Sequence, residues 1–284
     1  MTNHQAYLLG FIGAGKLAGS VIRGLVSAGF CPPTRIIASE PNHEVRDALV
    51  RDTGISGTAE NREVAQQAEI LFIGVKPSVV LPVLHELAAM ISRKVVVSLA
   101  AGVRISSMEK TARARFLRAL TNTPSAIGSA ATAVAFSSHS SSADKELAKK
   151  LFGSIGVVVE VEEKYMDAVT ALSGSGPAFV YTVIEGLAEG GKRCGLPAEV
   201  AFALASQTVL GAARLAIESN LSPEALRRMV VTPGGTTAAG LAELDKFGTM
   251  DGLIAAVEAA ARRSRELAEE TARDGLPAKP HPHA

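Results

Sequence analysis

The 284-residue sequence lacks several features that mark large classes of protein. It contains only two cysteines, Cys31 and Cys194, far apart and without metal-ligand spacing, so we expect buried free thiols and a reducing compartment. It has no excess of either charge, with 29 basic and 28 acidic residues, which argues against binding to nucleic acid or a membrane surface. No uninterrupted run of about 20 apolar residues occurs, so we expect no transmembrane helix.

The first apolar stretch, Tyr7 to Ile12, does not resemble a signal peptide. It is shorter than a signal-peptide core, has no basic flank and leads into a glycine-rich turn. We interpret it as a β-strand and expect a cytoplasmic protein. Hydrophobic residues make up 47% of the chain, which is ample for hydrophobic cores.

Short β-branched runs alternate with segments of helical period from residue 7 to about residue 160. This alternation is typical of βαβ units and predicts a largely parallel sheet. Runs such as ILFIGV and KVVVSLA are apolar at successive positions, which predicts strands buried on both faces by helices. The predicted strands are Tyr7–Gly13, Arg35–Ser39, Ile70–Val75, Val95–Leu99, Phe116–Thr121, Thr132–Phe136 and Val157–Val161.

After Glu163 the pattern becomes helical throughout, because Ala, Leu, Gly and Glu recur at helical spacing. Many of these residues are small, which permits close approach of helices. The apolar character exceeds what one helical layer with a solvent face needs, so we infer a subunit interface, most simply a two-fold dimer; a bundle packed on the first domain is the alternative. Helices are expected within residues 165–218, 222–229 and 236–272.

These patterns predict an α/β protein with a second, all-α domain. Residues 1–163 form the predicted dinucleotide-binding domain and residues 164–274 the helical domain. Residues 275–284 are rich in proline, and we expect them to be disordered, with their histidines reflecting composition and not a metal site.

A glycine-rich turn follows the first predicted strand and opens a helix, which is the context of a dinucleotide-binding fingerprint. Gly13 permits the tight turn, Gly15 lets a pyrophosphate approach the backbone, and Ala18 is small enough for the helix to pack on the strand. An ordinary βα turn is the alternative, which the surrounding βαβ pattern disfavours. The predicted phosphate-binding residues are Gly13, Ala14, Gly15, Lys16 and Leu17.

Ser39 and Glu40 follow the second predicted strand, where the adenosine ribose of a dinucleotide lies. Glu40 could accept a hydrogen bond from a free 2′-hydroxyl, which favours NADH. Ser39 could instead donate to a 2′-phosphate if Glu40 turns outward, which favours NADPH. We expect Ser39 to bind the cofactor and NADPH to be that cofactor, with NADH as the alternative.

The later strands of the predicted sheet end in residues suited to line a cofactor cleft. In an open α/β sheet, ligands bind beyond the carboxyl ends of the strands. The amide of Asn122 could bond the nicotinamide end, and an Asx turn before Pro124 is the alternative. The residues expected to line the cleft are Val75, Lys76, Pro77, Ala100, Ala101 and Asn122.

The sequence offers no conventional acid–base set. It shows no Cys/His/Asp constellation, no cluster of metal ligands and no Tyr-x-x-x-Lys pair. Reduction of a C=N bond suits such a protein, because the nicotinamide supplies the hydride and the imine nitrogen is itself basic.

Several stretches together resemble the pyrroline-5-carboxylate reductase family, whose members close proline biosynthesis. The stretches are GFIGAGKLA, SLAAGV, TNTP, DAVTALSGSGPAF and TPGGTTAAGLAELDK, and the resemblance covers nearly the whole chain. It implies a Rossmann-type domain followed by an all-α dimerisation domain. It also implies NAD(P)H-dependent reduction of 1-pyrroline-5-carboxylate to L-proline by a homodimer or an assembly of dimers.

The resemblance also implies a substrate site. In that family a loop between two C-terminal helices receives the substrate carboxylate on backbone amides, and a threonine hydroxyl bonds the ring nitrogen. Here that threonine is Thr237, beside Gly234, Gly235 and Thr236, and Glu163 lies near the substrate. The glycines and the helix start agree with an anion site, although a plain helix connector is the alternative.

Three alternative functions can be compared with the sequence. A β-hydroxyacid dehydrogenase would need a lysine early in the helix GPAFVYTVIEG, but no lysine occurs before Lys192. A non-catalytic NAD(P)-sensing dimer would not need the threonine-rich loop. A reductase of another cyclic imine, such as the six-membered homologue, stays open because ring size depends on pocket volume.

Overall fold

The computed structural model describes residues 7–274 and divides into two compact units. The sheet unit comprises Met1–Ser175 with Ala259–Ala284, and the helical unit comprises Gly176–Glu258. The division therefore falls later than the boundary predicted after Glu163. The predicted tail, residues 275–284, lies outside the described residues.

The division between the two units lies after Ser175 because two segments of the predicted second domain pack with the sheet. Met166 is completely buried in one of the cores of the sheet unit. In the last helix, the Ser264 hydroxyl donates to Asp167 Oδ1 at 2.6 Å. Gly102 lies so close to that helix that a Cβ there would be 3.2 Å from the backbone nitrogen of Ala268.

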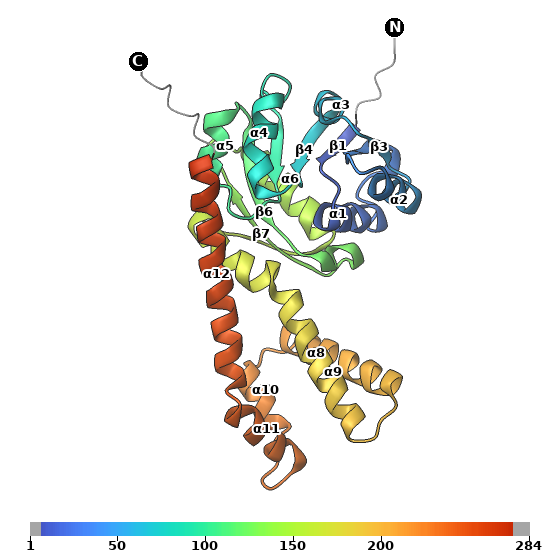
Figure 1. Ribbon diagram of the computed structural model, residues 1–284, viewed down its shortest axis with the longest axis vertical. Coiled ribbons are helices and arrows are strands. Elements are labelled where there is room, and N and C mark those ends of the chain that lie inside the picture. Colours follow the sequence, from blue (N-terminus) through green and yellow to red (C-terminus); the bar gives the residue numbers. More distant parts are fainter. Residues whose placement is uncertain (1–6, 275–284) are drawn as a thin grey trace, which may run out of the picture. The chain divides into compact units, whose positions relative to one another are not determined.

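The sheet unit is built on one eight-stranded sheet of order β3-β2-β1-β4-β5-β6-β7-β8 (Figure 1). Neighbouring strands run parallel except β6 and β7, which confirms the largely parallel sheet. The strands are β1 (Tyr7–Ile12), β2 (Ile36–Ser39), β3 (Ser56–Thr58), β4 (Ala68–Ile73), β5 (Val95–Ser98), β6 (Arg115–Leu120), β7 (Ala130–Phe136) and β8 (Gly156–Glu160).

Each predicted strand is present, and one further strand, β3, was missed. Its sequence, Ser-Gly-Thr, is short and has no apolar residue, so it carries no strand pattern. A Cβ at Gly57 would lie 2.7 Å from Val50 Cγ2, so tertiary packing and not strand propensity places this segment. The prediction that β4 and β5 are buried on both faces is confirmed, whereas Val157 and Val159 of β8 are exposed.

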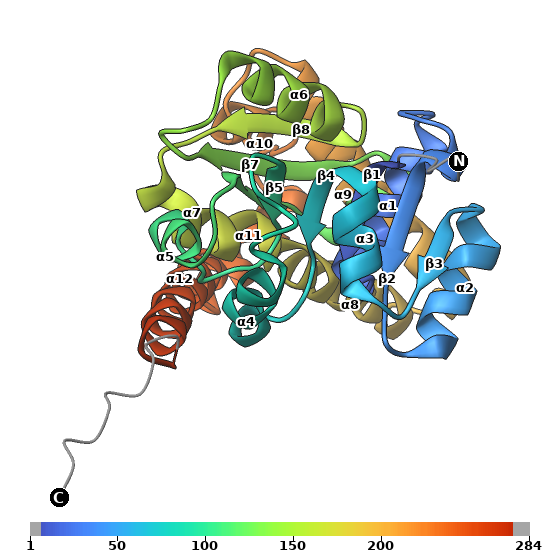
Figure 2. The same cartoon turned by 90° about the horizontal axis from the view of Figure 1, so that it is seen from above.

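Helices cover both faces of the sheet, with α6 on one side and α4 and α5 on the other (Figure 2). The helices of the sheet unit are α1 (Lys16–Ser27), α2 (His43–Thr53), α3 (Asn61–Gln67), α4 (Pro77–Leu87), α5 (Ile105–Thr111), α6 (Ser142–Gly153) and the short α7 (Met166–Val169).

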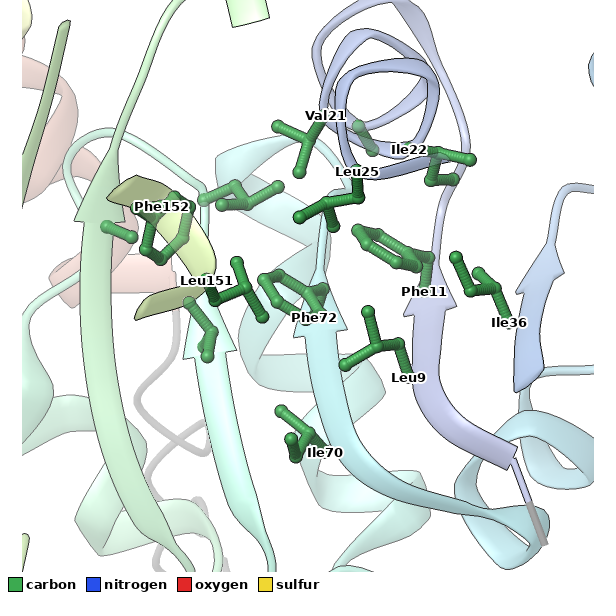
Figure 3. Close-up of a cluster of buried hydrophobic side chains, with 14 of the residues drawn as sticks. Leu9, Phe11, Val21, Ile22, Leu25, Ile36, Ile70, Phe72, Leu151 and Phe152 are labelled. Carbon is green, nitrogen blue, oxygen red and sulfur yellow. The ribbon is translucent and has the colours of Figure 1, made fainter. Parts of the chain in front are cut away.

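Successive residues of the central strands enter opposite cores. Phe11 and Phe72 stack at a centroid distance of 4.4 Å beneath α1, beside Phe152 of α6 (Figure 3). Their neighbours Ile12 and Ile73 belong to the core under α4 and α5. The period of two along each strand is what makes an apolar run serve both layers.

The helical unit contains α8 (Gly176–Arg193), α9 (Ala198–Glu218), α10 (Pro223–Met229), α11 (Thr236–Lys246) and the start of α12 (Thr249–Asp274), so the all-helical prediction is confirmed. Small residues make the contact between α8 and α9: Ala188, Ala201 and Ala205 are its buried core. Larger apolar side chains of these two helices stay exposed: Val180, Tyr181, Val183, Leu187, Val200, Phe202, Leu204, Leu210, Leu215 and Ile217.

Among the described residues, α9 is the one helix long and apolar enough to cross a membrane by length and composition alone. The sequence analysis expected no such helix. Only 11% of its most apolar stretch is buried, whereas a core helix would be mostly buried. This helix therefore presents an apolar surface that no part of residues 7–274 covers.

The two cysteines differ in environment. Cys31 is buried in the sheet unit, and burial raises the pKa of its thiol, although Arg35 opposes the shift. Cys194 is exposed, which corrects the expectation that both thiols are buried. It follows the end of α8 at a turn that leads to Gly195, where no second layer covers the chain. Both thiols are free.

We predict that Gly24→Ala destabilises the protein. Alanine usually favours a helix, but a methyl group at Gly24 would lie 2.1 Å from the carbonyl oxygen of Ser125. Displacing that backbone should cost about 1–3 kcal/mol, measured by thermal or urea unfolding. Gly153→Ala is the matched control, because its nearest neighbour would be Val158 Cγ1 at 3.9 Å. Equal stability of the two variants would contradict the packing argument.

Candidate active site

The turn after β1 requires glycine at its first position. Gly13 has φ +82°, and a Cβ there would lie 2.8 Å from Val75 Cγ1 and 3.0 Å from the carbonyl carbon of Gly74. The Gly13 amide donates to Ser39 O at 3.0 Å, which ties the turn to β2. These contacts hold the start of α1 at the carboxyl edge of the sheet.

The reason for glycine at position 15 is different from that at position 13. Its φ is −63°, which any residue adopts, and a Cβ there would meet no protein atom within 4 Å. The protein's own packing therefore does not demand glycine at this exposed position. A ligand that approaches the backbone closely would demand it, and the first amides of α1 lack partners within the helix. A phosphate group fits this place.

A cavity of about 600 Å³ lies beside this turn in the sheet unit. It is formed at the carboxyl ends of β1, β4, β5 and β6, as expected for an open α/β sheet. Most of the predicted cofactor residues line it: Gly15, Lys16, Leu17, Val75, Lys76, Pro77, Ala100, Ala101 and Asn122.

The sequence analysis did not anticipate that the segment before α8 lines the same cavity. Thr170, Gly174 and Ser175 contribute to its wall, and residues 170–174 form a π-helical turn, a geometry frequent at functional sites. The contact of this segment with the strand ends depends on the fold and has no local sequence signal.

Asn122 lines the cavity but already has partners in the fold. It is 7% exposed, its Nδ2 donates to Ser173 O at 3.0 Å, and its Oδ1 accepts from the Ala131 amide at 3.1 Å. Neither bond is the Asx turn considered as the alternative. Asn122 therefore braces the π-helical turn against the sheet, with one N–H hydrogen left over.

Ser39 does not join the cavity, which corrects the prediction that it contacts the cofactor. The residue is completely buried, and its hydroxyl donates to Asn61 Oδ1 at 2.7 Å. The neighbouring Glu40 faces the glycine turn instead, because its Oε2 accepts from the Ala14 amide at 3.2 Å. The side chain available at the end of β2 is thus a carboxylate and not a hydroxyl.

Glu163, predicted to lie near the substrate, has two partners within the sheet unit. Its Oε1 accepts from the Ile105 amide at 2.7 Å and from Arg118 Nη1 at 3.0 Å. Arg118 is only 3% exposed, and its Nε and Nη2 have no partner among the described residues. Glu163 and Arg118 line a separate cavity of about 420 Å³, which shares no residue with the cavity at the glycine turn. In the sheet unit, Glu163 neutralises a buried guanidinium and caps the start of α5.

The loop before α11 belongs to the helical unit and has the geometry of an anion site. Gly234 has φ +71°, and the Gly235 amide donates to Thr232 O at 2.9 Å, which closes a tight turn. The helix begins at Thr236, as predicted, and no side chain caps it. The amides of its first turn therefore lack intrahelical partners and carry the positive end of the helix dipole.

Thr237 keeps its hydroxyl free. Threonines within helices, such as Thr170 and Thr208, donate to the carbonyl four residues earlier. At the second position of α11, Thr237 has no helical carbonyl behind it, and no hydrogen bond from its hydroxyl is present in residues 7–274. The residue is half-buried, and its hydroxyl is an unused hydrogen-bond donor within the described residues.

Within the part of the chain that the structure describes, no group of three or more His, Cys, Asp or Glu side chains could hold a metal ion. The polar side chains that line the cavity at the glycine turn are Lys16, Lys76, Thr121, Asn122, Thr123, Thr170 and Ser175.

Comparison with known proteins gives consistent results. Residues 163–267 match the family model for pyrroline-5-carboxylate reductase dimerisation, and residues 8–102 match the model for NADP oxidoreductase, coenzyme F420-dependent. The chain is 42% identical to pyrroline-5-carboxylate reductase of Glycine max over 93% of this chain and 97% of that protein. It is 41% identical to pyrroline-5-carboxylate reductase 2 of Homo sapiens over 91% of this chain and 83% of that protein.

Solved structures agree over the full length. Plasmodium falciparum pyrroline carboxylate reductase with NADP bound has a TM-score of 0.86 and 29% identity, covering 93% of this chain and 99% of that chain. A pyrroline-5-carboxylate reductase from Coxiella burnetii has a TM-score of 0.82 and 34% identity, covering 92% and 98%.

We predict that Glu163→Ala acts on stability and not on substrate affinity. The change leaves the buried Arg118 guanidinium without its carboxylate partner within residues 7–274, which should cost roughly 2–4 kcal/mol, less than for a fully buried pair because Glu163 is 31% exposed. Unfolding measurements would test this, with Glu162→Ala as the control, since Glu162 pairs only with the exposed Lys164. A raised KM for the substrate with unchanged stability would instead place Glu163 at the substrate.

Proposed function

The chain belongs to the pyrroline-5-carboxylate reductase family, and we propose that its substrate lies between the cofactor cavity of one subunit and the Thr237 loop of another. The reaction is the NAD(P)H-dependent reduction of the C=N bond of 1-pyrroline-5-carboxylate to L-proline, the last step of proline biosynthesis. The observation that carries the proposal is the pair of anion sites, one in each compact unit.

The residues of the sheet unit suit NAD(P)H. The open space at Gly15 and the first amides of α1 would hold the pyrophosphate, and the cavity beyond the strand ends would hold the nicotinamide half. Bound NAD(P)H supplies the hydride. Asn122 and the π-helical turn that it braces form the wall against which the reacting ring would be positioned.

The loop of the helical unit suits the substrate carboxylate. The amides of Thr236 and Thr237 point from a helix start, and the two preceding glycines let a ligand approach the backbone. The Thr237 hydroxyl would donate to the ring nitrogen. A neutral donor orients the C=N bond without adding a fixed charge, and the basic nitrogen can carry its own proton.

A hydroxyacid dehydrogenase finds no support in α8. Lys192 is its first lysine, sits in the last turn and pairs with Glu189 at 2.5 Å. The helix therefore offers no ammonium group at its start, where the π-helical turn meets the cavity.

A second copy of the chain is the proposed cover for the exposed apolar residues of α8 and α9. The dimerisation model matches residues 163–267, which includes both helices. Small residues hold α8 and α9 together and leave the larger apolar side chains outward, as at a two-fold interface. Assembly of dimers into a larger particle and a cytoplasmic location are further proposals; the free thiols Cys31 and Cys194 agree with the second.

We predict that Thr237→Val lowers kcat about 10- to 100-fold, because it removes one hydrogen bond that strengthens in the transition state while keeping the side-chain shape. Thr237→Ser should keep most of the rate. The assay follows NADH or NADPH oxidation on addition of 1-pyrroline-5-carboxylate, and cofactor affinity should be the same in all three proteins. An unchanged kcat in Thr237→Val would remove the hydroxyl from the mechanism, and no oxidation by the unaltered protein would refute the function.

We predict that Leu210→Glu breaks the dimer. Leu210 is 60% exposed on α9, and a carboxylate there would be buried without a partner at an apolar interface. Light scattering after size exclusion should give at least twice the chain mass for the unaltered protein and a lower mass, down to that of one chain, for the variant. Ile127→Glu, at a 79% exposed apolar residue of the sheet unit, is the control and should stay dimeric. A dimeric Leu210→Glu protein would place the interface elsewhere.

A further inference from the structure

The end of β2 presents one acidic side chain whose position is fixed from several sides. Glu40 Oε2 accepts from the Ala14 amide at 3.2 Å, and its Oε1 accepts from the Asn42 amide at 3.1 Å. Its own amide donates to Thr58 O at 3.0 Å, and its carbonyl accepts from Arg46 Nη1 at 2.9 Å. The carboxylate is thus held toward the glycine turn and not toward solvent.

Strand pairing puts this carboxylate at the adenosine end of the nucleotide site. In the parallel pair of β1 and β2, Ile12 lies opposite Ser39, so Glu40 lies level with the residues of the turn. In dinucleotide-binding folds the adenosine ribose occupies this place, and an acidic residue there accepts hydrogen bonds from its hydroxyls.

A 2′-phosphate at the same place would need hydrogen-bond donors, and three candidate side chains already have partners. The Ser39 hydroxyl is buried against Asn61. Arg46 donates to the Glu40 carbonyl and lies 3.6 Å from Asp47, and Arg62 pairs with Glu86 at 2.9 Å. Arg46 and Arg62 therefore both have carboxylate neighbours, whereas the Glu40 carboxylate faces the position of the phosphate.

We propose that Glu40 determines cofactor choice and makes this reductase bind NADH more tightly than NADPH. The proposal rests on the assigned cofactor site. A free 2′-hydroxyl donates to the carboxylate, whereas a 2′-phosphate places a second negative charge against it, and juxtaposed like charges are strongly unfavourable. The Plasmodium falciparum relative was solved with NADP bound, so this preference belongs to the side chains of this chain and not to the fold.

The test measures binding without substrate. Isothermal titration of NADH and NADPH into the unaltered protein should give a Kd for NADH at least about tenfold lower than that for NADPH. Glu40→Gln should bring the two values together, mainly by tightening NADPH, because glutamine loses the charge but still offers one acceptor to the Ala14 or Asn42 amide. Glu44→Gln is the matched control, an exposed carboxylate in the first turn of α2, and should keep the original ratio.

The dependence of the NADH and NADPH Kd values on salt concentration gives a second test. Repulsion between the carboxylate and a phosphate is screened, so the ratio of the two Kd values should shrink as salt rises in the unaltered protein and stay flat in Glu40→Gln. Thermal unfolding would verify that both variants are folded.

Two results would overturn the proposal: NADPH binding as tightly as NADH to the unaltered protein, or a ratio unchanged by Glu40→Gln. Because no substrate is present, loss of reductase activity cannot produce either result. Binding of neither nucleotide would overturn the cofactor-site assignment and the proposal with it.

Discussion

The contact between the turn after β1 and the end of β4 is the constraint on which the rest of this protein depends. Gly13 and Gly74 approach so closely that a Cβ on Gly74 would lie 2.8 Å from Gly13 O and 2.7 Å from Ala18 Cβ. The Gly74 amide also donates to Ile12 O at 2.8 Å. Only residues without side chains, or with very small ones, allow α1 to start there, and that start brings its free amides to the edge of the cofactor cavity.

Small side chains also set the packing of the helical unit, but there they leave the larger apolar side chains exposed. Alanines at the contact of α8 and α9 bring the helices together but bury little apolar surface. Leucine, phenylalanine and valine side chains point outward instead. In the function proposed above, the nucleotide site lies in one unit and the carboxylate site in the other, and a dimer formed through this surface would bring the sites of two subunits together.

Two carboxylates, Glu40 and Glu163, and one carboxamide, Asn122, show that residue type alone does not define a role. Glu40 and Glu163 were both candidates for ligand contact, yet Glu163 neutralises a buried arginine whereas Glu40 faces the glycine turn. Asn122 lines the cofactor cavity while its carboxamide links β7 to the π-helical turn. In each case at least one partner comes from a distant part of the chain, so local sequence could not identify it.

The sequence by itself determined the alternation of strands and helices, the glycine turn, the loop before α11 and the family. These depend on local rules: apolar period, the φ angles that glycine permits, and motifs within one stretch of chain. Only the tertiary structure decided that β3 joins the sheet, that the boundary follows Ser175, that Ser39 is buried and that Glu40 is not. The physical reason is that burial and hydrogen bonding depend on which segments meet, and neighbouring residues such as Ser39 and Glu40 point to opposite sides of a strand end.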